Sequence, residues 1–347
     1  MDDADGGRRG LRPRVTPGLL EFVQQQYELV DSQPVDLGGS SSLNLLFVDE
    51  GRRQVVRVYR PYVSETRLAA IHHVRAVLLD GGVPIARLVE SRTGTGWARY
   101  EDHLIEVEQH VEYDSVMHDW DRLAGGLPLL GHIHSLLRPI DVGPSARQPL
   151  FANHIDAVDA LAHTRTGARR IRSWDPTPDE LAVADSAEEL AERLAQIEPK
   201  LAPGLPQQQL VHGDFWDNNV GFRHGNLVLL ADFDFMGVRP RIDDLALTLY
   251  FALSDLAAGD VSERTIRMLA GLITAYQTGL DVPLSAEERA ALPLALARQP
   301  LWSIGGWVAR LDDTTAARTH AAHCGPSLTA SLRILAELRQ WRDAFGS

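Results

Sequence analysis

The sequence is poor in cysteine, in long apolar runs and in positive charge. Its one cysteine, Cys324, excludes an internal disulfide framework and fits a reducing compartment. No stretch approaches the roughly 18 uninterrupted apolar residues of a membrane-spanning helix, so we expect no membrane partner. The opening residues, MDDADGGRRGLRPR, lack the apolar run of a signal peptide, and we therefore expect a cytoplasmic protein.

Basic residues are outnumbered by acidic ones. Lysine and arginine total 34 against 47 aspartates and glutamates, which gives a net charge of −13 at pH 7. A protein that holds phosphate backbones needs the opposite balance, so we expect no nucleic-acid partner. An acidic surface instead favours cationic small molecules, such as aminoglycosides. At 347 residues and 44% hydrophobic content, the chain can bury enough apolar surface for two lobes.

The first third of the chain is predicted to contain strands and helices in alternation. Residues 1–15 are polar and are expected to form a disordered tail. A helix should begin in TPGLLEFVQQQY, with Thr16 as N-cap and Pro17 at its first position. Two β-rich runs flank the turn DEGR, and SETRLAAIHHVRAVLLDGG then has helical spacing after Ser64. The segment LIEVEQHV predicts a further strand.

The rest of the chain is dominated by helical patterns, including LPLLGHIHSLLR, DSAEELAERLAQIEPKL and LAELRQWRDAF. Two short apolar strands interrupt them in QQLVHGDFWDNNVGFRHGNLVLLADFDFMG. We therefore expect an α+β protein of two lobes. Residues 16–111 should form a small N-terminal lobe with an antiparallel sheet and a helix, and residues 112–347 a larger, mainly helical lobe.

Short polar side chains gather around that interruption. Asp214 follows the apolar QLV, Asn219 comes five positions later, and Asp232 ends the apolar LVLLA. Adjacent antiparallel strands bring such ends together, and the resulting oxygen-rich cluster suits a hard cation such as Mg²⁺. With Asp214 available to take a proton, the cluster has the parts that phosphoryl transfer needs. The alternative is a polar hairpin with Asx turns.

These residues resemble a known family. HGDFWDNN is similar to the HGDxxxxN catalytic loop of the aminoglycoside phosphotransferase and choline kinase-like family, itself similar to the HRDxxxxN loop of protein kinases. Asp232 follows Asp214 by 18 positions, and Asp244 in RIDDLA follows Asp232 by 12, as in that family. The resemblance covers roughly residues 35–255 and implies a bilobal protein kinase-like fold.

The resemblance implies a role for each matching residue. Asp214 would be the catalytic base, and Asn219 and Asp232 would be ligands of Mg²⁺. His212 would brace the loop, and Asp244 would tie the loop to the following helix through backbone hydrogen bonds.

The resemblance also implies an ATP site in the small lobe. LGGSSSLNLLF resembles the phosphate-covering hairpin, VVRVYRP the strand that carries a phosphate-contacting base, and the end of LIEVEQHV the hinge that meets adenine. The implied ATP-binding residues are Gly38, Gly39, Ser40, Arg57, Glu108, Gln109 and Val111.

Two departures from the family pattern concern the phosphate contact. The strand residue is commonly lysine, but here it is Arg57, which holds phosphates with a planar fork. The following helix has AAIHH where a partnering glutamate is expected, and Glu65 is the only acid in its first turns. His72 and His73 in that helix have no third ligand at useful spacing, so a surface pair is expected.

The predicted function is an ATP- and Mg²⁺-dependent phosphotransferase that moves the γ-phosphate to a hydroxyl of a small molecule. An aminoglycoside, another antibiotic, a nucleoside or a metabolite could be the acceptor, and the sequence does not identify its binding residues. Three alternatives stay open: a serine/threonine protein kinase of the bacterial stress-response type, a non-catalytic nucleotide-binding module, and a metal-dependent hydrolase.

Overall fold

The computed structural model describes residues 12–30, 33–39, 42–49, 51–60, 63–148, 154–201 and 208–346. Ser40 and residues 1–11 of the expected tail lie outside these ranges. The chain divides into two compact units, the first reaching Asp114 and including Phe222–Ala231, and the second formed by the rest. The lobe boundary expected from the sequence, after Val111, lies three residues earlier.

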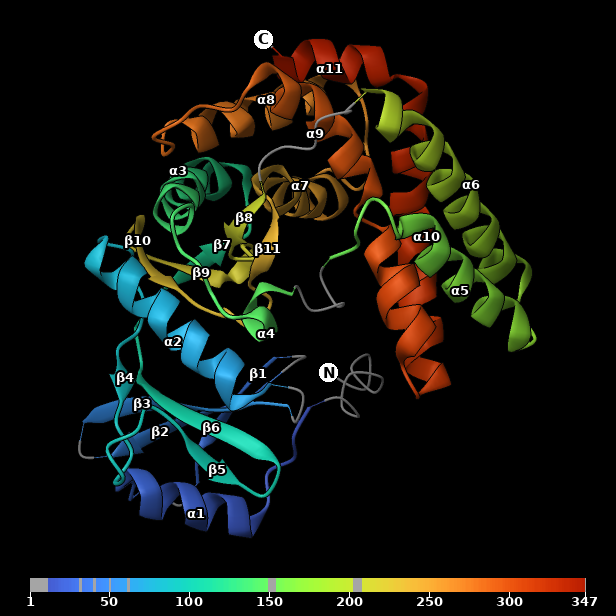
Figure 1. Cartoon of the computed structure of the whole chain (residues 1–347). Coiled ribbons are helices and arrows are strands. Elements are labelled where there is room, and N and C mark those ends of the chain that lie inside the picture. Colours follow the sequence, from blue (N-terminus) through green and yellow to red (C-terminus); the bar gives the residue numbers. More distant parts are fainter. Residues whose placement is uncertain are drawn as a thin grey trace. The chain divides into compact units, whose positions relative to one another are not determined.

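The first unit is built on an antiparallel sheet (Figure 1). Its strands follow the order β1–β2–β3–β6–β4, and β5 pairs with β6 as well. The elements of this unit are α1 (Pro17–Tyr27), β1 (Val35–Gly38), β2 (Leu43–Asp49), β3 (Arg52–Val58), α2 (Glu65–Asp80), β4 (Leu88–Val89), β5 (Ala98–Tyr100), β6 (His103–Gln109) and β10 (Asn226–Leu230).

The two helices of this unit begin where their capping residues predict. Thr16 accepts a hydrogen bond from the Leu19 N–H at the start of α1, and Pro17 occupies the first helical position. Ser64 caps α2 in the same way through the Arg67 N–H. Both N-caps, and the hairpin of β2 and β3, are therefore confirmed.

The two faces of the sheet differ in character. One face carries alternate residues such as Leu45, Val56 and Val107, which pack with Leu19 and Val23 of α1 in one buried cluster. The opposite face carries a polar row across three strands: Asn44, Arg57 and Glu106 lie directly opposite one another in register. The alternation of side chains thus places the phosphate-contact candidate on the polar face.

The second unit is mainly helical, as expected. Its elements are β7 (Ser115–Met117), α3 (Trp120–Leu137), α4 (Pro144–Arg147), α5 (Ala160–Ser173), α6 (Pro178–Leu201), β8 (Gln208–Val211), β9 (Asp217–Arg223, whose last two residues belong to the first unit), β11 (Gly237–Pro240), α7 (Arg241–Phe251), the π-helix η2 (Ala252–Leu256), α8 (Glu263–Gln277), α9 (Ala286–Arg298), the π-helix η3 (Ser303–Val308), α10 (Thr314–Ala336) and α11 (Leu338–Gly346). β8 pairs antiparallel with β11, so that Val211 lies opposite Gly237. This pairing brings the segment after β8 next to the segment before β11.

The helix α6 begins earlier than the sequence pattern indicates. It starts at Pro178, whereas the amphipathic pattern begins at Asp185. Thr177 and Glu180 form a reciprocal cap, because the Thr177 N–H donates to the Glu180 carboxylate and the Glu180 N–H donates to the Thr177 hydroxyl. The TPDE segment is therefore a capping box that sets the start of the helix.

Within the described ranges, none of the helices combines the length and the apolar character needed to cross a membrane.

Candidate active site

The loop between β8 and β9 contains a glycine that no other residue can replace without strain. Gly213 has a φ of +85°, which a side chain disfavours. A Cβ atom there would lie 2.2 Å from the carbonyl oxygen of Phe235. The close passage of these two backbone segments fixes the direction in which the next residue, Asp214, leaves the loop.

Asp214 is held by the asparagine five residues later. The Asn219 Nδ2 group donates to the backbone oxygen of Asp214 and to its carboxylate Oδ2, both at 2.9 Å. Backbone hydrogen bonds from Trp216 to Asp214 and from Asn219 to Trp216 tighten the same turn. The Asn219 Nδ2 is thereby committed to Asp214, and its other amide atom, an oxygen, is a possible metal ligand.

The carboxylate of Asp214 lies in a concentration of negative charge. Burial raises its pKa well above the ordinary aspartate value, and the neighbouring Asp232 raises it further, against the lowering effect of the Asn219 hydrogen bond. Asp244 and Asp234 add to the rise. A group with a raised pKa accepts a proton more readily, which is the property that a general base requires.

Asp244 ties the loop to α7, as the resemblance implies. Its Oδ1 accepts from the Gly213 N–H at 2.9 Å, and its Oδ2 lies 3.0 Å from Nε2 of His134 in α3. The other ring nitrogen of His134 lies 2.7 Å from the Tyr276 hydroxyl. Burial alone would raise the pKa of Asp244, but the His134 contact and nearby positive groups outweigh it and lower the pKa.

His212 braces the loop from within. Its side chain is fully buried against the rings of Phe215 and Phe233, with the Phe233 centroid 4.7 Å away. Its Nδ1 accepts a hydrogen bond from the Asp214 N–H at 3.2 Å. These contacts position the backbone of the loop rather than expose the imidazole for catalysis.

The donor set at this position fits a magnesium ion in its chemistry. Asp232 follows β10, has a φ of +64°, and lies close enough to Asp214 to raise its pKa. A carboxylate and a carboxamide oxygen are ligands that Mg²⁺ prefers, and a divalent cation would relieve the crowding of carboxylates. Within the described ranges, no cluster of three or more His, Cys, Asp or Glu residues forms a metal cage. The fit therefore rests on a mixed set that includes Asn219.

In the first unit, Arg57 and the glycine turn are linked through one side chain. Arg57 on β3 is only 8% exposed and lies directly opposite Asn44 on β2. The Asn44 Nδ2 donates to the Gly38 carbonyl oxygen at 3.2 Å. Gly38 and Gly39 have φ values of +85° and +105°, which explains why glycines occupy this turn.

The expected hinge residues lie at the end of β6. The Glu108 carboxylate accepts from Arg75 at 2.7 Å, so its side chain is already engaged. The Gln109 N–H donates to the Arg87 carbonyl oxygen at 2.8 Å. Val111 follows the strand, and no described residue makes a hydrogen bond to its backbone. Of the three residues, Val111 has the backbone groups available for an adenine edge.

The comparison with protein families decides the identity of the fold. The sequence matches the phosphotransferase enzyme family (APH) over residues 33–291, which is most of its length. The chain belongs to this family. The expectation of a phosphotransferase with a kinase-like fold is confirmed at this level, and no curated protein matches the sequence closely enough to add to it.

Solved structures of phosphotransferases have the same fold. A microcompartment-associated aminopropanol kinase gives a TM-score of 0.68 at 15% identity, covering 93% of this chain and 98% of that chain. Amicoumacin kinase hAmiN, in complex with AMP-PNP, Ca²⁺ and Ami, gives 0.65 at 18% identity, with 95% and 96% coverage. An aminoglycoside phosphotransferase from Alicyclobacillus acidocaldarius gives 0.63 at 17% identity, with 95% and 97% coverage.

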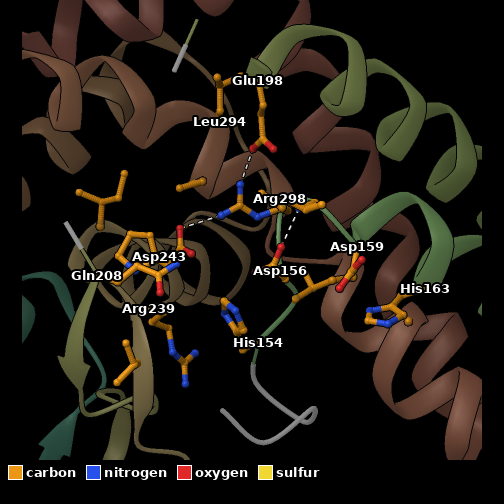
Figure 2. Close-up of a pocket in the computed structure, with 18 of the residues that line it drawn as sticks. His154, Asp156, Asp159, His163, Glu198, Gln208, Arg239, Asp243, Leu294 and Arg298 are labelled. Carbon is orange, nitrogen blue, oxygen red and sulfur yellow. Dashed lines mark hydrogen bonds and ion pairs between the residues drawn. The ribbon is translucent and has the colours of Figure 1, made fainter. Parts of the chain in front are cut away.

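The second unit of this phosphotransferase also contains a pocket of about 960 Å³. It is lined by the residues before α5, by α5 and α6, by the outer ends of β8 and β11, and by α7, α9 and η3. Figure 2 shows His154, Asp156 and Asp159 among its side chains. Arg239 also lines it and donates to the carbonyl oxygen of Phe235, which lies against Gly213 of the loop between β8 and β9.

Some of the carboxylates that line this pocket are paired with an arginine, and one is not. Glu198 and Asp243 flank Arg298, which pairs with both, the latter at 2.7 Å (Figure 2). Burial raises the pKa of each of these two acids despite the guanidinium between them. The carboxylate of Asp159, by contrast, receives no hydrogen bond or ion pair from the described residues and does not cap its own helix.

A neutral histidine lies beside these acids. Burial lowers the pKa of His154 well below its ordinary value, and Arg239 and Arg298 lower it further. A neutral imidazole has one donor and one acceptor, which suits a hydroxyl-bearing ligand.

Several residues of the site escape prediction from the sequence. His134 lies within LPLLGHIHSLLR, where a histidine among buried helix positions is a usable signal for a buried polar contact. The pocket residues come from separate segments and share no motif. His72 is predicted to lie on the surface, which is wrong, because its Nε2 lies 2.6 Å from the buried Glu106; His73 is exposed as expected.

Proposed function

We propose that this phosphotransferase moves the γ-phosphate of ATP, with Mg²⁺, to the hydroxyl of a small molecule that carries an amine. The observation that carries the proposal is the geometry around Asp214: a partly buried carboxylate with a raised pKa, oriented by Asn219 and next to Asp232. That arrangement matches the needs of a base that orients an attacking hydroxyl.

In the proposed reaction, the acceptor hydroxyl donates its hydrogen bond to Asp214. The new bond forms between the acceptor oxygen and the γ-phosphorus, and the bond from that phosphorus to the β,γ-bridging oxygen breaks, releasing ADP. The hydroxyl proton passes to the Asp214 carboxylate. Asn219 and Asp232 would hold Mg²⁺, which supplies charge neutralisation at the phosphates.

The first unit supplies the proposed nucleotide contacts. Arg57 offers a planar guanidinium to the phosphate oxygens from the polar face of the sheet. Gly38 and Gly39 form a turn without side chains, in which the Gly38 N–H already donates to the Asp36 carboxylate at 2.8 Å, and the Gly39 N–H is the proposed phosphate contact. The backbone of Val111 is the proposed partner of the adenine edge, because the described residues leave its groups without hydrogen bonds.

The pocket of the second unit is the proposed acceptor site. Its volume lies near the upper end of the range for small-ligand pockets, roughly 300–1,000 Å³. The carboxylates of Asp156 and Asp159 suit an ammonium group, and the neutral His154 suits a hydroxyl. Proteins of the same fold are named as kinases or phosphotransferases of aminopropanol, amicoumacin and aminoglycosides, which supports an amine-bearing acceptor.

The substitution Asp214→Asn tests the catalytic assignment. It keeps the size of the side chain and removes its ability to take a proton. We expect phosphate transfer to fall below detection, because the variant cannot accept the proton of the acceptor hydroxyl. The dissociation constant for ATP should stay within about twofold of the wild-type value, because Asp214 is proposed to contact the acceptor and not the nucleotide. Substantial transfer by Asp214→Asn would contradict the assignment.

A screen of ADP release tests the acceptor class. Amino alcohols, aminoglycosides and other hydroxylated amines are compared with matched compounds in which hydrogen replaces the amine. We expect turnover to concentrate among the amines. Transfer of label from ATP to the protein itself or to added proteins, without small-molecule turnover, would favour the protein-kinase alternative instead.

A further inference from the structure

The phosphate-contact candidate Arg57 faces an acid on its own sheet. Arg57 on β3 lies directly opposite Glu106 on β6, so that both side chains project from the same face. Arg57 is 8% exposed and Glu106 is 1% exposed. A buried guanidinium needs a counter-charge, and Glu106 is close enough for Arg57 to lower its pKa.

Glu106 is itself fixed by three donors. The Tyr59 hydroxyl donates to its Oε1 at 2.9 Å, and Arg75 Nη1 donates to the same oxygen at 2.8 Å. His72 Nε2 lies 2.6 Å from Oε2. Because both carboxylate oxygens are engaged, the Glu106 side chain has one fixed position on the polar face of the sheet.

The helix α2 contributes a guanidinium and an imidazole to this cluster instead of an acid. Its first-turn acid, Glu65, pairs at 2.8 Å with Arg99 on β5, and both side chains are about half exposed. Arg75, further along the helix, reaches Glu106 and also Glu108, at 2.7 Å. Arg75 thus faces two carboxylates with one positive charge. It neutralises Glu106 only in part, and the remaining negative charge of Glu106 can attract Arg57.

We propose that Glu106 is the positioning residue for Arg57, in place of the glutamate expected on the helix. The arrangement is reversed: the strand β6 supplies the acid, and α2 supplies the guanidinium of Arg75 and the imidazole of His72 that hold it. Glu106 places a fixed negative charge on the same face of the sheet as Arg57, which attracts the guanidinium and favours the orientation in which it meets the nucleotide phosphates. This role rests on the proposed function, since it requires that Arg57 contacts those phosphates.

A double-mutant cycle tests the proposal. Glu106→Gln removes the charge and keeps the shape, and Arg57→Met removes the guanidinium. We expect Glu106→Gln to raise KM for ATP about fivefold, the size of an attraction between two charges that share no hydrogen bond, with little change in KM for the acceptor. In the Arg57→Met background the same substitution should change KM for ATP less than about twofold, because the effect passes through Arg57.

Glu65→Gln is the matched control, because it makes the same chemical change in an exposed pair of the same unit. It should leave KM for ATP unchanged. Glu106→Asp keeps the charge on a shorter side chain and should give an intermediate KM, and it replaces Glu106→Gln in the cycle should that variant not fold.

Three outcomes overturn the proposal: an unchanged KM for ATP in Glu106→Gln, equal effects with and without Arg57, or a loss in Glu65→Gln as large as in Glu106→Gln. The same cycle on the free energy of unfolding, without nucleotide, should show coupling between Arg57 and Glu106. A wild-type protein that neither binds nor uses ATP overturns the proposed function and this role with it. The unfolding cycle then decides whether the charges of Arg57 and Glu106 are coupled at all.

Discussion

The side-chain amide of Asn219 donates to both the backbone oxygen and the carboxylate of Asp214, each at 2.9 Å. One asparagine thus fixes both the turn of the loop and the rotamer of the acid that the turn presents. The next residue back, Asn218, is exposed and makes neither contact.

Asn219→Ala should therefore damage catalysis far more than its neighbour. We expect kcat to fall on the order of 10–100-fold and the Mg²⁺ concentration for half-maximal rate to rise, because both the acid and a proposed metal ligand lose support. Steady-state kinetics over a Mg²⁺ titration measure this. Asn218→Ala is the control and should behave as wild type; equal losses in the two variants would contradict the assignment.

Asp214→Asn should stabilise the protein as it removes activity. The folded-state pKa of Asp214 is raised above the ordinary 3.8, first by burial and then by Asp232. A raised folded-state pKa means that stability is lost as the pH rises through it. The variant should melt at a higher temperature than wild type at pH 8 in EDTA, and this advantage should vanish near pH 4. A lower Tm at pH 8 would contradict the electrostatic account.

His134→Ala should destabilise the loop between β8 and β9. The substitution removes the donor that lies 3.0 Å from the buried Asp244 carboxylate. A buried carboxylate without this partner should lower the free energy of unfolding by about 1–3 kcal/mol. Tyr276→Phe removes only the contact on the far side of the imidazole and should cost less. Urea unfolding of the three proteins checks the order, and a larger loss in Tyr276→Phe would reverse the interpretation.

Acid should weaken the Glu106 cluster within a defined pH window. Burial alone would raise its pKa, but Arg75, His72 and Arg57 outweigh burial and lower the pKa from 4.5 to about 2. A lowered folded-state pKa contributes stability above pH 4.5 that is lost as the pH falls toward 2. The stability difference between wild type and Glu106→Gln should therefore shrink between pH 6 and pH 3, whereas the difference for Glu65→Gln should stay near zero.

Asp159→Asn should change which acceptors are used. If its carboxylate binds an ammonium group, KM should rise about tenfold for amine-bearing acceptors and stay constant for the matched compounds without the amine. Asp179→Asn makes the same change in charge at an exposed position in the first turn of α6 and serves as the control. Equal effects of both substitutions would indicate a general field of the acidic surface rather than a contact in the pocket.

Prediction from the sequence succeeds where the information is local. The caps at Thr16 and Ser64, the hairpin of β2 and β3, and the loop from His212 to Asn219 are each encoded within a few neighbouring residues. Short-range hydrogen bonds and side-chain alternation determine them, and a single sequence displays both.

Prediction fails where residues distant in the chain meet. The contact of His134 with Asp244 spans 110 positions, and that of Tyr59 with Glu106 spans 47. Neither pair has a spacing rule, because the packing of helices and the register of strands bring them together. The helical pattern after β3 contains no acid placed to pair with Arg57, whereas the register of β3 and β6 sets Glu106 opposite it.

The close passage of Gly213 and Phe235 limits how this loop can vary. Because a Cβ atom at position 213 would lie 2.2 Å from a carbonyl oxygen, even alanine would force two backbone segments apart at the point where β8 ends and β11 begins. In a library that randomises codon 213 and is selected for activity, glycine should be the sole survivor. A second library at position 218, five residues later and exposed, should accept many residues. Position 213 should therefore tolerate only glycine, whereas position 218 should tolerate many different residues.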